Sequence, residues 1–133
     1  MKNKFILFTL LFLNLAINAQ IGINTQNPKS TLDINGSFAS KVSVVAANTT
    51  LDMQHSVVIC NAPTPININL PTATSISGRI YIIKNVTNNA VSIVAKNAQT
   101  IDGNTNVTIN NINTVFQVIS DGNNWFIIDK YIP

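Results

Sequence analysis

His55 is the only histidine of the chain and Cys60 the only cysteine, so these two residues are the first candidates for nucleophilic catalysis. A neighbouring histidine can act as the base that activates a serine or cysteine. Along an extended strand, however, residues five positions apart point to opposite faces and lie about 16 Å apart, at about 3.3 Å per residue. Ser56, the adjacent residue, also faces away from His55. The spacing therefore argues against a dyad, and we expect Cys60 to fill a core position.

The carboxylates are equally unpromising for acid–base or metal chemistry, because the chain has five aspartates and no glutamate. Asp102 and Asp121 each precede a glycine, where aspartate commonly forms a turn by bonding its own backbone. The stretch 102–106 begins like a calcium loop, but Val107 and Asn113 stand where that motif needs glycine and glutamate. We therefore expect no catalytic residue, no bound metal and no cofactor.

Aromatic side chains are the remaining candidates for recognition. Trp125 is the only tryptophan and is followed by Phe126, and Tyr81 and Phe116 lie in other apolar stretches. A ring at a hairpin can stack on a sugar, whereas a tryptophan within an apolar strand more often fills a core or an interface. These four residues are the predicted interface or ligand contacts.

The basic residues argue against nucleic acid as a partner. The formal net charge of +3 includes Lys2 and Lys4, so the chain beyond residue 19 is close to neutral. Its remaining cations are scattered singly along the sequence. Nucleic-acid binding needs clustered lysine and arginine to neutralise phosphates.

The N-terminus has the pattern of a secretory leader. Lys2 and Lys4 precede an apolar run, Phe5–Leu13, and a small residue, Ala19, stands before the expected cleavage site. A membrane-spanning helix would need about 20 apolar residues, and Asn14 interrupts the run too early. We expect residues 1–19 to be a helical signal peptide, the protein to be periplasmic, on the cell surface or extracellular, and no stable membrane span to remain after cleavage.

The elements that must position these residues are short strands. Isoleucine, valine and threonine dominate, and they favour strands because branched side chains fit a pleated surface. Asparagine, glycine, aspartate and proline separate the candidate strands, which are 31–34, 41–46, 56–60, 66–69, 79–84, 91–95, 107–109, 114–120 and 124–129. The sequence predicts an all-β fold, as a short-stranded antiparallel sandwich or meander.

Several of these strands are apolar on both sides, since neighbouring side chains alternate between faces. In the stretch 114–120, Val115 and Ile119 oppose Phe116 and Val118. A single-layer antiparallel sheet normally has one polar face that is exposed to solvent. We therefore expect the fold to be completed by self-association of copies.

The region before the first of the long strands has a recognisable order of residues, namely Gly22, Ile23, Thr25 and Pro28, then Leu32-Asp33 and Asn35-Gly36. Further on, Leu70-Pro71 precedes the strand at 78–86, a Thr-Ile-Asp-Gly turn stands at 100–103, and Ser-Asp-Gly-Asn-Asn-Trp stands at 120–125. In this order the chain resembles tail-fibre and other exported fibre-like proteins of bacteria and their viruses. The resemblance divides it into a turn-rich N-terminal segment, 20–40, and a β-rich fibre-like domain, 41–133.

The resemblance implies a non-enzymatic structural or adhesion module, built as a homotrimer, with polar loops available to a cell-surface or glycan partner. The alternative is a monomeric carbohydrate-binding β-sandwich with Trp125 or Tyr81 at the sugar site.

Overall fold

The computed structural model describes residues 20–133, so the expected signal helix lies outside the described residues. The described residues divide into two compact units, 20–39 and 40–133. We call the first the N-terminal unit and the second the C-terminal unit.

The N-terminal unit is one parallel pair of short strands, β1 (Ile21–Ile23) and β2 (Leu32–Ile34). Backbone hydrogen bonds at both ends of the pair, one of 2.7 Å from the Ile21 amide to the Thr31 carbonyl, fix its register. The connection between the strands is tightly folded, because a Cβ on Gly22 would stand 2.5 Å from the Thr25 carbonyl oxygen. Only glycine fits at that position.

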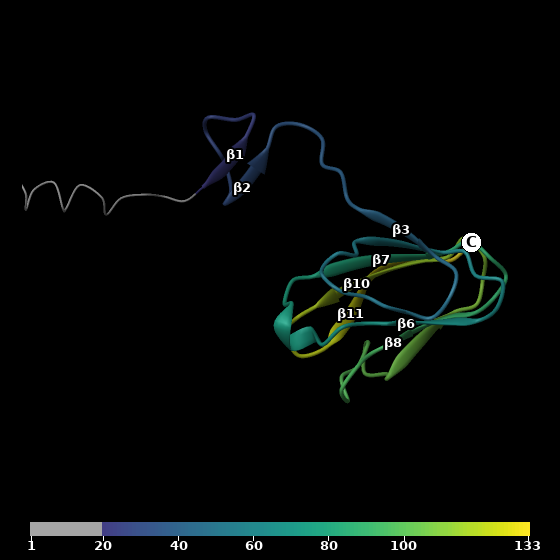
Figure 1. The fold of residues 1–133 in the computed structure, drawn as a ribbon. Coiled ribbons are helices and arrows are strands. Elements are labelled where there is room, and N and C mark those ends of the chain that lie inside the picture. The colour runs from purple at the N-terminus through teal and green to yellow at the C-terminus, as the bar shows by residue number, and fades with distance from the viewer. Residues whose placement is uncertain (1–19) are drawn as a thin grey trace, which may run out of the picture. The chain divides into compact units, whose positions relative to one another are not determined.

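The C-terminal unit contains nine strands, which are β3 (Val42–Val45), β4 (Thr49–Thr50), β5 (Val57–Cys60), β6 (Ile66–Asn69), β7 (Ile80–Asn85), β8 (Val91–Val94), β9 (Asn106–Ile109), β10 (Val115–Ser120) and β11 (Trp125–Tyr131). They form a five-stranded sheet, ordered β11-β10-β7-β5-β3, and a four-stranded sheet, ordered β4-β6-β8-β9. One short 3-10 helix, η1 (Ala73–Ser75), follows β6. The all-β prediction is confirmed, and the two layers are visible in Figure 1.

The strand pairing corrects the expectation of an antiparallel sandwich. From β3 to β8 the chain passes to the other sheet at every strand, so each strand lies beside the one two places earlier and runs parallel to it. Only the later pairs are antiparallel, namely β8 with β9, and β10 with both β7 and β11. The unit is thus three stacked two-strand coils closed by antiparallel strands at one end.

The core lies between the two sheets, and alternate residues of nearly every strand enter it. Val58, Tyr81 and Ile83 of the five-stranded sheet, and Ile68 and Ile93 of the four-stranded sheet, are fully buried. Alternation with a period of two places the intervening residues of each strand on the opposite side of its sheet.

One buried polar side chain connects the loops at an end of the core. Asn85, the last residue of β7, is fully buried and hydrogen bonded on both sides of its amide. Its Nδ2 donates to the Asn89 carbonyl over 2.9 Å, and its Oδ1 accepts from the Thr87 amide over 3.0 Å. A buried amide of this kind costs little only when its hydrogen bonds are made.

Candidate functional site

The five-stranded sheet presents a broad apolar surface on the side away from the core, which we call the outer face. Strand register places its side chains in three rows. They are Ile80, Ile119 and Phe126; then Val42, Val57, Ile82, Gln117 and Asp129; then Val44, Ile59, Lys84, Val115 and Tyr131. Apart from Gln117, Asp129 and Lys84, every member is an aliphatic or aromatic residue.

Much of this outer face is accessible to solvent within the single chain. Val44 on the edge strand β3 is 66% exposed and Phe126 on β11 is 41% exposed, while the central strands contribute half-buried side chains. Each large apolar side chain left in water forgoes about 1.5–3 kcal/mol relative to full burial. Contiguous apolar patches larger than a few hundred Å² are rare on monomeric proteins and mark interaction sites.

The four predicted contact residues are divided between the core and the outer face. Trp125 and Tyr81 are fully buried, with ring centroids 5.6 Å apart, and Phe116 is almost so. Only Phe126 lies on the outer face. A fully buried ring offers no surface on which a sugar could stack.

The outer face extends further than the sequence indicated, because β3 contributes Val42 and Val44. The stretch 41–46 has apolar residues on both sides, but its place beside β5 depends on the parallel pairing. No local signal in the sequence identifies that neighbour.

His55 has a carboxylate partner that the sequence analysis did not propose. Its Nδ1 lies 2.7 Å from Oδ1 of Asp52, in a turn where the same oxygen accepts the Gln54 amide over 2.8 Å. The hydrogen bond from the Gln54 backbone amide is the main cause that lowers the pKa of the Asp52 carboxyl below its ordinary value of 3.8, and the hydrogen bond with His55 lowers it further. The signal was the Asp-x-x-His spacing within a turn.

This pair closes a turn and is not connected to a nucleophile. Among residues 20–133, no serine, threonine or cysteine side chain hydrogen bonds to His55. Cys60 is fully buried, and burial raises the pKa of its thiol to about 11. A protonated, inaccessible thiol is a poor nucleophile.

Asp102 occupies the turn that resembles the start of a calcium loop. Its backbone has a φ of 49°, and Gly103 beside it has a φ of 82°. Its carboxylate accepts the amide of Ile127 over 3.3 Å, and its own amide donates to the Trp125 carbonyl over 3.1 Å. The turn therefore covers part of the free edge of β11. Within residues 20–133, no group of three histidine, cysteine or acidic side chains is arranged to hold a metal ion.

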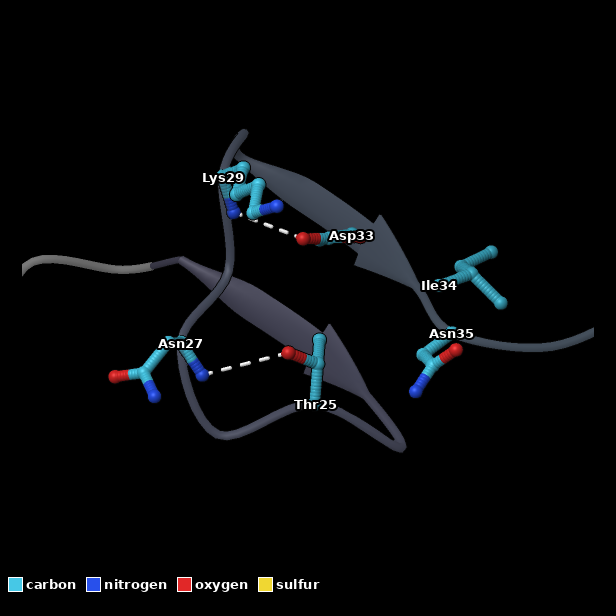
Figure 2. Close-up of a pocket in the computed structure, with 6 residues that line it drawn as sticks. All are labelled: Thr25, Asn27, Lys29, Asp33, Ile34 and Asn35. Atoms are coloured by element: carbon cyan, nitrogen blue, oxygen red, sulfur yellow. Dashed lines mark hydrogen bonds between the residues drawn. The ribbon is translucent and has the colours of Figure 1, made fainter.

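The N-terminal unit carries a shallow polar hollow of about 350 Å³ (Figure 2). Its two charged side chains are Lys29 and Asp33, and Oδ2 of Asp33 accepts the Lys29 amide over 2.8 Å. The backbone N–H of Asn27 donates to Oγ1 of Thr25 across the same loop. These hydrogen bonds hold the loop between β1 and β2, so the polar side chains have a structural role.

Comparison with known proteins adds no relative. A scan against protein-family models gives no match, and a search of curated proteins finds none. Across the described residues, no helix has the length and apolar character needed to cross a membrane.

Proposed function

We propose that this protein is an exported, non-enzymatic structural module of fibre or adhesin type, which self-associates by burying its outer face between copies. The observation that carries the proposal is the outer face itself, with its three apolar rows on the solvent side of the five-stranded sheet. The associated state that we propose is the homotrimer, and the leader directs the chain to the periplasm, the cell surface or the medium.

The physical support is the imbalance between the two sides of the five-stranded sheet. One side packs on the four-stranded sheet, and no element of the C-terminal unit forms a layer over the other. The N-terminal unit also exposes large apolar side chains, including Ile21 at 60% and Leu32 at 54%. Two-stranded sheets are marginally stable on their own, so an associated state that also covered these side chains would stabilise the N-terminal unit.

The buried positions of Trp125 and Tyr81 weigh against the carbohydrate-binding alternative in the form that the sequence suggested. Polar loops remain available to a cell-surface or glycan partner in the associated state. A glycan array on the exported protein tests this directly, because sugar binding by a stable monomer would favour the alternative.

Self-association is tested by cross-linking the exported protein with an amine-reactive reagent over a range of concentrations. Lys41 and Lys130, which are both exposed, supply reactive amines beside and on the five-stranded sheet. We expect bands that end at the trimer and persist on dilution. A monomer at every concentration would overturn the proposal.

A further inference from the structure

We propose that Lys84 of one copy forms an ion pair with Asp129 of a neighbouring copy, and that this pair selects a second copy of the chain as the occupant of the outer face. The inference rests on the proposed function, because it names the partner and the register of that same face. Lys84 and Asp129 are the only charged side chains in its three rows.

Lys84 lies on the central strand of the outer face, in the last of its three rows and between apolar neighbours. It is half-buried on β7, with Ile59 of β5 on one side and Val115 of β10 on the other. When the face is covered, its ammonium group leaves water. Burying an ammonium group without a partner carries a large desolvation penalty. A partner that covers the face must therefore bring a negative charge or leave water at this site.

Asp129 supplies that charge from the same surface. It lies on β11 opposite Gln117 and is exposed. Among residues 20–133 the single ion pair is that of His55 with Asp52, so Lys84 and Asp129 are both unpaired within one copy. They stand two strands and one row apart, about 12 Å along the sheet at ordinary strand spacings. A second copy stacked on the face can present its carboxylate to the ammonium directly.

The charge pattern favours a copy of the same chain over an unrelated partner. One cation and one anion at a fixed offset in an apolar surface are complementary to the identical surface, so each copy gives its lysine to a neighbour and receives a lysine at its aspartate. A two-fold pair makes this contact twice, and a three-fold ring makes it three times.

The size of the face indicates why the charges matter. Five strands about 4.8 Å apart and about five residues long give a flat area of the order of 400 Å². A standard interface buries about 800 Å² per partner. The apolar rows alone are thus at the weak end of specific association, where complementary charges decide which surfaces associate.

The test is charge reversal with rescue. We would prepare the full exported chain as Lys84→Asp, as Asp129→Lys and as the double variant, with Lys96→Asp, an exposed lysine after β8, as the control. Each single reversal places like charges together. We expect sedimentation velocity to show an association constant weakened by about 100-fold, with recovery in the double variant and no change in the control. Circular dichroism of the Trp125 region checks folding.

Mixing the two single variants distinguishes a three-fold ring from a two-fold dimer. In a two-fold dimer the mixture satisfies both contacts and restores association fully. In a three-fold ring one contact of the three stays repulsive, so only the double variant restores it fully. Either result supports the ion pair and assigns its symmetry.

Two outcomes overturn the inference while leaving self-association in place: single reversals that associate like the wild type, and reversals that dissociate without rescue in the double variant. A wild-type chain that is monomeric at all concentrations overturns the proposed function, and the ion pair with it.

Discussion

Ile119 of β10 lies directly opposite Phe126 of β11, on the outer face of the five-stranded sheet. The residue before Phe126, Trp125, is paired with Ser120 and enters the core. Two adjacent aromatic residues thus have different surroundings, and substitutions at each separate folding from association.

Replacing Phe126 with serine should dissociate the oligomer and leave each subunit folded, because the ring is partly exposed in the single chain. We expect the free energy of unfolding of the monomer to change by about 1 kcal/mol or less. Trp125→Ala is the matched comparison and should cost about 3–5 kcal/mol, since it removes a fully buried ring. Sedimentation velocity and urea unfolding measure the two effects. Equal loss of stability in both variants would contradict the assignment of Phe126 to a docking face.

The single thiol should be inert in the native protein. Cys60 is fully buried, and burial raises the pKa of its thiol to about 11, so at pH 8 it is protonated and inaccessible. We expect a chromogenic disulfide reagent to modify it only as fast as the protein opens, and at once in urea. A Cys60→Ser, Ser37→Cys variant provides the exposed control. Stoichiometric labelling of native Cys60 within seconds would contradict this picture.

Aspartates in two turns should make the free energy of unfolding fall at acidic pH. Backbone amides of Asn124 and Asn123 lower the pKa of the Asp121 carboxyl, and the Gln54 amide and His55 lower that of Asp52. A lowered carboxyl pKa contributes stability that is present above the unfolded value and is lost as pH falls through the folded value. Urea unfolding at pH 7, 4 and 3 should therefore show a decline that begins near pH 4. If the Asp52→Asn, Asp121→Asn double variant declines as steeply as the wild type, these turns are not responsible.

The N-terminal unit should be sensitive at one glycine and tolerant at another. A Cβ on Gly22 would stand 2.5 Å from a backbone oxygen, whereas one on Gly36 meets nothing nearer than 4.0 Å. We expect Gly22→Ala to speed amide exchange at Ile21 and Asn35 by at least about 10-fold, since those amides make the bonds that close the β1–β2 pair. Gly36→Ala should leave both amides protected. Unchanged exchange in Gly22→Ala would contradict the observed packing.

Much of the strand content follows from local signals in the sequence. The apolar stretches on either side of Asp121-Gly122 form the β10–β11 hairpin, as this turn signal predicts, and a loop of four residues, 121–124, connects the two strands. The two-sided apolar character of β7 and β10 is also confirmed, with Tyr81 and Phe116 inside while Ile80 and Ile119 lie on the outer face.

The partner of each strand could not be predicted from the sequence. The alternation of apolar and polar residues shows which side of a sheet a residue faces, and not which strand lies beside it. β3 and β5 are parallel only because β4 takes the chain to the other sheet between them. β4 has two residues, Thr49 and Thr50, too few for any periodicity. β1 was missed because glycine occupies the centre of its Ile-Gly-Ile stretch.

The sequence predicted strands that are apolar on both sides, but not which strands together form the outer face. Opposed apolar residues within one strand can be read from sequence, whereas the rows that join Val44 of β3 to Val115 of β10 depend on the register of four strands. The register shift between Gln117 and Val118 likewise moves Asp129, and not Ile128, opposite Gln117. No local pattern indicates such a bulge.

The most direct test of the central claim is an isotope-filtered NMR measurement on a mixture of labelled and unlabelled copies, which detects only contacts between molecules. We predict intermolecular contacts from the methyl groups of Ile82 and Ile119 on the outer face, and none from those of Ile83 and Ile93 in the core. Contacts confined to other surfaces, or their complete absence at millimolar concentration, would contradict burial of the outer face between copies.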